Sequence, residues 1–164
     1  MKRLIYYSIV VGVVVIGYLL ADSLAAILAA NAVPVAQDTL HQQKIYAYRD
    51  WQSVGVQVHP GETVEIQAEG EWLYTPGDYH GPKGHPRYAA PNFYPIANVP
   101  SGILIGRIGE TGEPFPVGSH TWYATRGNQE QGPLYLRIND DILSDNKGAV
   151  VVDVTVTQVA EAYR

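Results

Sequence analysis

The stretch "GPLYLRINDDILSDNKGAVVVDVTVT" (132–157) contains two alternating apolar runs joined by a polar connection. In the first run, Leu134, Leu136 and Ile138 fall on one face. In the second run, a valine occupies every even position of 150–156. A period of two is typical of strands that bury one face. The stretch therefore predicts two consecutive strands with a polar connection between them.

The same alternation occurs upstream in "TVEIQAEGEW" (63–72), where Val64, Ile66 and Ala68 oppose Glu65 and Gln67. Glycine- and proline-rich turns separate these runs, and no stretch of the domain has a 3.6-residue apolar period. Shorter strands are predicted at 45–49, 53–58, 103–108 and 119–124. The fold class that follows is all-β, a small antiparallel jelly-roll β-sandwich.

The amino end has a different character. Lys2 and Arg3 precede an uncharged, mostly apolar run of 18 residues, 4–21. A helix of that length spans about 27 Å, close to the ~30 Å of a bilayer core. The run therefore predicts a single transmembrane helix in an N-terminal signal anchor, residues 1–32. Cleavage as a signal peptide after Ala30-Asn31-Ala32 is the alternative.

Both interpretations give the same sidedness, because the two basic residues hold the amino end in the cytoplasm. The expected location is the cytoplasmic membrane, with a periplasmic or extracellular carboxyl-terminal domain. Residues 33–44 are mostly polar and lack a clear period, which predicts a linker. The sandwich domain is then expected to span 45–164.

Residues 75–101 interrupt the strand pattern with six prolines, three glycines and four aromatic residues. Long loops in compact domains are usually functional or disordered, and the aromatic content argues against disorder. This region is expected either to cover one edge of the sandwich or to form one wall of a binding site.

The polar connection 139–148 holds three aspartates and two asparagines in ten residues. Calcium takes about six to eight oxygen ligands from carboxylates, amides and carbonyls, and Asp140, Asp145 and Asn146 supply such oxygens. Magnesium fits less well, because it retains more water and demands a stricter octahedron. A solvated acidic turn is the alternative, because Asp and Asn are also common turn formers.

Five segments in order, "GETVEIQAEGEWLY", "HGPKG", "GILIGRIG", "PVG" and "LYLRINDDILSDNKGAVVVDV", resemble the calcium-dependent galactose-binding bacterial lectin family. The resemblance covers about residues 45–158. It implies one Ca²⁺ bound by the loop between the last two strands, with a sugar diol completing the coordination. Its implied ligands are the carbonyls of Tyr74 and of Ile142 or Leu143, and the side chains of Asp140, Asp145 and Asn146.

The resemblance also implies that Tyr74, His85, Asp140 and Asn146 contact the sugar. Two departures from the family pattern bear on this. The segment from Asp140 to Asp145 is shorter by about two residues than its family counterpart. Tyr88 stands where the family has a sugar-contacting glutamine, so calcium binding can persist while galactose affinity is lost.

Other chemistry is disfavoured. The chain has no cysteine and no concentrated basic face, which excludes thiolate chemistry and argues against nucleic acid. The glutamates of 65–71 look like a solvated strand face, so no catalytic residue and no enzyme activity are predicted. His80 and His85 have no third metal ligand nearby in sequence, and the five histidines are expected on surface loops.

Two functions remain. One is a membrane-anchored, extracytoplasmic, calcium-dependent carbohydrate-binding module, with galactose-type sugars among its candidate ligands. The other is a non-catalytic accessory subunit of a larger membrane complex, in which the lectin-like domain docks on or caps the assembly.

Overall fold

The computed structural model of the chain describes residues 37–75 and 78–158. Within these residues, no helix is long and apolar enough to cross a membrane. The predicted transmembrane helix of residues 1–32 lies outside the described residues, so it stays a prediction.

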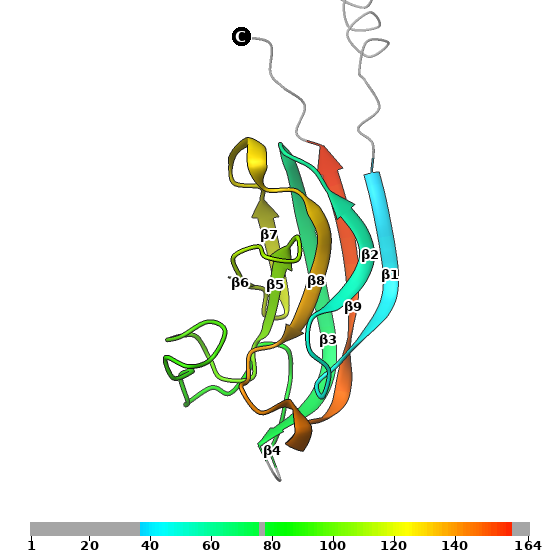
Figure 1. Cartoon of the computed structure of the whole chain (residues 1–164). Helices are drawn as coiled ribbons and strands as arrows, with labels where there is room; N and C mark the ends of the chain where they lie inside the picture. The colour runs from blue at the N-terminus through cyan, green and yellow to red at the C-terminus, as the bar shows by residue number, and fades with distance from the viewer. Residues whose placement is uncertain (1–36, 76–77, 159–164) are drawn as a thin grey trace, which may run out of the picture. The chain divides into compact units, whose positions relative to one another are not determined.

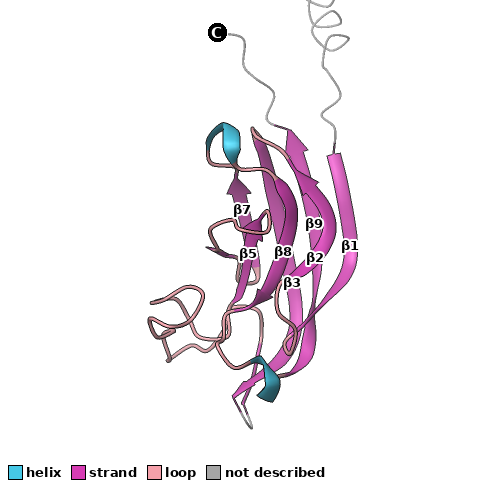
Figure 2. Ribbon diagram, in the orientation of Figure 1, coloured by secondary structure: helices cyan, strands magenta, loops and turns pink. Residues whose placement is uncertain are grey.

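Two antiparallel sheets build the described domain (Figure 1). In the five-stranded sheet, β1 (Gln37–Tyr46), β9 (Lys147–Gln158), β3 (Glu62–Thr75) and β4 (Asp78–His80) are neighbours in that order, and β7 (His120–Ala124) also pairs with β3. The four-stranded sheet has the order β2 (Gln52–Val58), β8 (Gly132–Ile138), β5 (Leu104–Ile108) and β6 (Phe115–Pro116). Two short 3-10 turns, η1 (Gly127–Gln129) and η2 (Leu143–Asp145), complete the elements (Figure 2). The predicted all-β class is confirmed.

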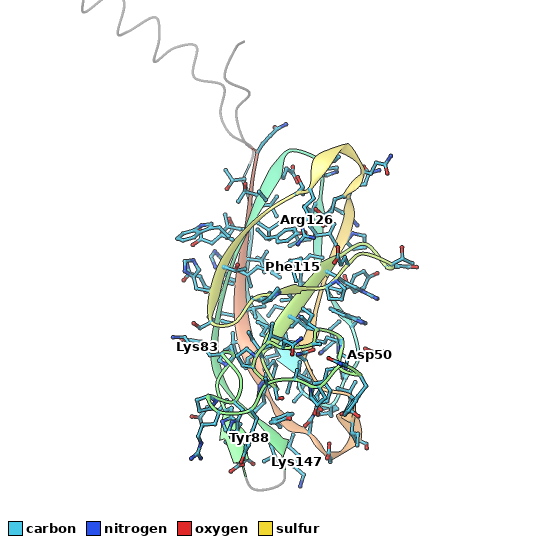
Figure 3. The ribbon with its side chains drawn as sticks, turned by 90° about the vertical axis from the view of Figure 1, so that its left-hand side faces the viewer. Asp50, Lys83, Tyr88, Phe115, Arg126 and Lys147 are labelled. Atoms are coloured by element: carbon cyan, nitrogen blue, oxygen red, sulfur yellow. The ribbon has the colours of Figure 1, made fainter. Side chains whose placement is uncertain are left out.

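The apolar residues that alternate along the sequence are buried on one face of each strand, as their period of two predicted. Val64 and Ile66 of β3 and the even-numbered valines of β9 are at most 3 % exposed, as are Leu134 and Leu136 of β8. Phe115 of β6 lies among the side chains between the sheets (Figure 3) and stacks on Tyr123, with 3.7 Å between ring centroids. Each fully buried aliphatic or aromatic side chain contributes about 1.5–3 kcal/mol, so this layer stabilises the sandwich.

Strand β1 differs from the expectation. It begins at Gln37, inside the segment predicted as a linker, and pairs with the edge of β9. The register shifts between Leu40 and Gln43, and Gln42 has a φ of +58°. This bulge adds one residue to the strand, so the positions opposite β9 change parity after Leu40. The predicted strand 45–49 therefore overlaps only the last two residues of β1, Ile45 and Tyr46, and residues 47–50 turn toward β2 instead.

The long proline-rich region is ordered by backbone hydrogen bonds. Its first residues form β4 against the end of β3, and Ala89 and Pro100 form an isolated bridge. Ser101 accepts a bond from the His85 N–H at 2.8 Å and donates one to the Tyr88 carbonyl at 2.9 Å. Figure 1 shows this region at the end of the sandwich where β8 connects to β9. The region therefore lies beside the predicted calcium loop.

Candidate functional site

The connection between β8 and β9 holds two almost fully buried polar side chains, Asp140 and Asn146, which are 3 % and 2 % exposed. The Asn146 amide nitrogen Nδ2 donates to Asp140 Oδ2 at 2.8 Å and to the Ala47 carbonyl at 3.4 Å. The other carboxylate oxygen, Asp140 Oδ1, accepts the Asp141 N–H at 2.8 Å. The sequence places these residues six positions apart, and the short loop folds them against each other.

The oxygen Oδ1 of Asn146 is buried and has no hydrogen-bond partner among the described residues. Both neighbours of Nδ2 are acceptors, so the amide orientation is fixed and Oδ1 faces away from them. A buried polar atom without a partner costs about 1–3 kcal/mol. A divalent cation would satisfy this oxygen together with the adjacent carboxylate. The residues present therefore fit a hard metal ion that prefers oxygen ligands, such as calcium.

The electrostatics of Asp140 agree with that fit. Burial raises the pKa of its carboxyl, and hydrogen bonds from Asn146, Tyr94 and the Asp141 backbone oppose the shift. Desolvation disfavours the ionised carboxylate unless a positive charge comes close. The buried guanidinium of Arg137 donates from Nη2 to the main-chain oxygen of Asp140 at 2.6 Å, which fixes the start of the loop. A bound cation would supply the missing charge on the carboxylate side.

The other predicted ligands are placed less closely. Ile142 is 54 % exposed, and the Asp145 side chain is also exposed, at the end of η2. Tyr74, at the end of β3, is half-buried, and its hydroxyl lies 3.1 Å from the hydroxyl of Tyr94. The structure therefore joins Asp140 and Asn146 directly, and reaches Tyr74 through Tyr94. The roles of Ile142, Asp145 and the Tyr74 carbonyl as ligands stay predictions.

Tyr94 and Arg137 belong to this site, although the sequence interpretation did not select them. Arg137 alternates with Leu136 and Ile138 and looks like a solvent-facing position, yet it is only 8 % exposed. Tyr94 comes from the proline-rich region, 46 residues before Asp140 in sequence. No local pattern marks either residue, because Tyr94 is placed by the fold of the long loop, and Arg137 by its bonds to Asp50 and to the main-chain oxygen of Asp140.

His85 is only 4 % exposed, which corrects the expectation that the histidines lie on the surface. Its Nδ1 accepts the backbone N–H groups of Arg87 at 3.1 Å and Tyr88 at 3.2 Å. The Tyr88 ring packs on the imidazole, with 4.2 Å between centroids, and stays 62 % exposed. Figure 3 shows Tyr88 at the same end of the domain as Lys147, the first residue of β9. His85 and Tyr88 therefore lie at the loop end of the sandwich, and their contact with a sugar stays a prediction.

His80 packs edge-on against His85, with 4.5 Å between ring centroids, and its Nε2 is buried without a hydrogen-bond partner among the described residues. Asp78 joins them, and one ligand atom from each of the three side chains lies within 4.8 Å of the others. The sequence interpretation missed Asp78 as a third ligand. Asp78 and His80 share a face because they stand two residues apart on β4, but a strand of three residues leaves no pattern in the sequence that marks Asp78.

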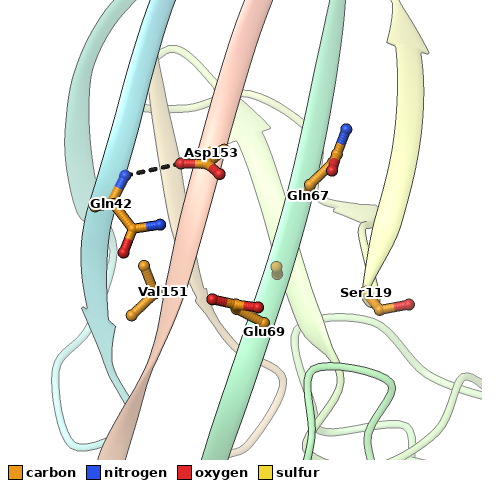
Figure 4. A pocket seen from close by; sticks show the side chains of 7 residues that line it. Gln42, Gln67, Glu69, Ser119, Val151 and Asp153 are labelled. Carbon is orange, nitrogen blue, oxygen red and sulfur yellow. Dashed lines mark hydrogen bonds between the residues drawn. The ribbon is translucent and has the colours of Figure 1, made fainter.

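A separate shallow hollow of about 140 Å³ lies on the outer face of the five-stranded sheet (Figure 4). Asp153 closes part of it by accepting the Gln42 N–H at 2.8 Å. Its lining residues are mostly polar: Gln42, Gln67, Ala68, Glu69, Ser119, Val151 and Asp153. None of the predicted site residues lines this hollow.

Comparison with known proteins supports the fold. No family model matches the chain, and no curated protein matches it. A solved structure described as the EclA N-terminal domain, a PllA-like lectin, is similar to it, with a TM-score of 0.53 and 24 % sequence identity. The match covers 71 % of this chain and 95 % of that chain. The described domain therefore has a lectin-like β-sandwich fold.

Proposed function

We propose that the chain is a membrane-anchored, extracytoplasmic carbohydrate-binding module with a calcium ion in its sugar site. The observation that carries the proposal is the buried, unpartnered Oδ1 of Asn146 beside the buried carboxylate of Asp140. The lectin-like fold supports the sugar. The apolar run 4–21 behind Lys2 and Arg3 supports a single-pass anchor in the cytoplasmic membrane.

Asp140 and Asn146 would hold the ion from the β8–β9 connection, and Asp145 and the carbonyls of Tyr74 and Ile142 complete the proposed ligand set. When bound, calcium would coordinate two vicinal sugar hydroxyls at positions that water molecules otherwise fill. Tyr94 favours the ionised form of the Asp140 carboxyl and so opposes the rise in its pKa. Arg137 holds the Asp140 backbone, so the carboxylate keeps its place before the ion arrives.

His85 and Tyr88 would contact the sugar beyond the ion. Because Nδ1 of His85 accepts two backbone N–H groups, the neutral ring carries its proton on Nε2. That nitrogen is therefore a donor suited to a hydroxyl oxygen. The exposed Tyr88 ring offers an apolar surface of the kind that packs on the C–H face of a sugar.

Calorimetry of the full-length chain tests this function. Calcium is titrated first, and galactose and a panel of neutral monosaccharides follow, with and without calcium. We expect one calcium site and sugar binding that depends on it. Asp140→Ala should abolish calcium uptake, whereas Asp141→Ala, which removes an exposed neighbouring carboxylate, should retain it. Unchanged calcium binding by Asp140→Ala would refute the site.

The second candidate is an accessory subunit of a larger membrane complex. Trp122 on β7 favours it, because this large side chain is 66 % exposed on a strand that pairs with β3. Exposed aromatic residues are enriched at protein interfaces. A mild-detergent extract should then retain partners irrespective of free sugar, and Trp122→Ala should release them.

A further inference from the structure

The side chains of Asp78, His80 and His85 are brought together by a short strand and a tight return of the chain. Asp78 and His80 face the same way on β4, because alternate strand residues share a face. The chain then turns at Gly81–Gly84, where the Gly84 N–H donates to the Gly81 carbonyl at 3.0 Å. Gly84 has a φ of +74°, and a Cβ there would lie 2.6 Å from the Ile103 nitrogen. Only glycine fits this return, which sets His85 against His80.

We propose that these three side chains form a second metal site that binds Zn²⁺; it shares no ligand with the predicted calcium site, but zinc and the proposed sugar hydroxyl would compete for Nε2 of His85. Their ligand atoms lie within 4.8 Å of one another, and His80 Nε2 is buried without a partner. Two imidazoles and one carboxylate suit zinc, whereas calcium prefers oxygen ligands alone. Water would fill the fourth position.

The three ligand atoms must move closer together before they can all bind one zinc ion. Zn–N and Zn–O bonds of about 2.0–2.2 Å in a tetrahedron place ligand atoms roughly 3.4 Å apart. Asp78 is exposed at the start of β4, so its carboxylate can move by that amount. The rings of His80 and His85 already pack edge to face, with 4.5 Å between their centroids, and this packing limits their motion. The carboxylate is therefore the ligand expected to close onto the ion.

Zinc binding also requires a proton shift on His85. Its Nδ1 accepts the N–H groups of Arg87 and Tyr88, so Nε2 is the nitrogen left for a metal, and in the free protein Nε2 carries the proton. On coordination this proton moves to Nδ1, and the two backbone N–H groups turn to water. The loss of two neutral hydrogen bonds costs roughly ten- to a hundredfold in affinity. For the site to fill, the bonds from zinc to its three ligands must outweigh this loss.

Calorimetry with zinc chloride tests the proposal on the full-length chain, untagged and saturated with calcium. We expect one zinc per chain. Changing a residue that merely supports a metal ligand typically lowers metal affinity by about tenfold to a hundredfold. Losing a ligand itself should cost at least as much, so we expect His80→Gln and Asp78→Asn each to lower the zinc affinity by more than about tenfold. Calcium binding should not change in either variant. The matched control is His120→Gln, which removes a histidine paired to one carboxylate, Glu65, at 2.9 Å.

A second readout uses the unmodified chain and decides the question even if the variants unfold. In ¹⁵N nuclear magnetic resonance, zinc should shift the backbone amides of Arg87 and Tyr88 and convert His85 Nδ1 to the protonated form. The proposal is overturned if no zinc binds, if His120→Gln weakens binding as much as His80→Gln, or if the Arg87 and Tyr88 amides do not move.

Discussion

The side chain of Asn139 pairs with the backbone of Ile96, 43 residues earlier in the chain, through two hydrogen bonds. Oδ1 accepts the Ile96 N–H at 3.0 Å, and Nδ2 donates to the Ile96 carbonyl at 2.8 Å. Asn139 is fully buried at the end of β8. One amide therefore ties the proline-rich region to the β8–β9 connection in the way that a neighbouring strand would.

Replacing Asn139 with alanine should loosen the proline-rich region while the sandwich stays folded. Two partly buried backbone groups of Ile96 would lose their partners, and full burial would cost about 1–3 kcal/mol for each, so we expect a smaller loss here. We expect faster hydrogen exchange at Ile96 and earlier proteolysis within 86–100. Asn92→Ala is the control, because Asn92 is an exposed asparagine of the same region. Equal protection in both variants would show that the Asn139 amide does not hold the region.

Gly102 should be irreplaceable for a reason beyond its backbone conformation. Its φ is +69°, and a Cβ would lie 2.8 Å from Cγ of Tyr74. Gly127 has the same φ of +69° but nothing within 4 Å of a Cβ. Both glycine-to-alanine changes incur the strain of a positive φ, about 1 kcal/mol. Only Gly102→Ala should displace Tyr74, so it should unfold at lower denaturant and bind calcium more weakly. Equal denaturation midpoints would contradict this.

The sequence predicted the strands that keep strict alternation, because a period of two follows directly from burying one face of a sheet. Predicted strands 53–58, 103–108 and 119–124 match β2, β5 and β7 to within one residue. Strand β1 was predicted only at its last two residues, as part of 45–49, because its bulge changes the parity of the buried positions after Leu40. Strand β4 was missed because three residues are too few to show a period.

The residues of the candidate site also differ in whether the sequence marks them. Asp140 and Asn146 were predicted because their oxygens are close in sequence and a short loop must bring them near each other. Tyr94 and Asp78 were not predicted as site residues, because their neighbours are set by the turns of the proline-rich region. Tertiary contacts of that kind leave no periodic signal in the chain.

Glu65 should make stability depend on pH in the acid range. The hydrogen bond with His120, and a smaller one with Gln67, lower the pKa of Glu65 from its usual 4.5. Below pH 4.5 the unfolded chain therefore binds more protons at this group, and stability rises with pH. The contribution is present above pH 4.5 and is lost as the pH falls through the lower folded value.

Urea unfolding of the wild type and Glu65→Gln at several pH values measures this contribution. The difference in unfolding free energy should shrink below pH 4.5 and stay constant from there to pH 6. Glu71→Gln, an exposed carboxylate of the same strand, serves as the reference. A difference that does not vary with pH would contradict the assignment.

Calcium should stabilise the wild-type domain and have no such effect on Asp140→Asn. An ion that binds only the folded state adds about 2.7 kcal/mol at a hundred times its Kd. Scanning calorimetry with calcium and with a chelator gives the shift in Tm. In the wild type the chelator should lower the Tm. A calcium-dependent Tm in Asp140→Asn would show that the ion binds elsewhere.

Tyr88 should matter for sugar binding more than its neighbour Phe93, although Phe93 is the more exposed ring. The two are 62 % and 70 % exposed, and both belong to the proline-rich region. The ring centroids of Tyr88 and His85 are 4.2 Å apart, whereas those of Phe93 and Tyr94 are 5.4 Å apart. Because His85 presents a fixed Nε2 donor, a sugar that accepts this hydrogen bond lies beside Tyr88. Tyr88→Ala should therefore weaken calcium-dependent sugar binding by about tenfold, the loss of roughly 1.4 kcal/mol, and Phe93→Ala should leave it unchanged. Sugar titration by calorimetry compares the two, and a larger loss in Phe93→Ala would place the sugar on the other side of the loop.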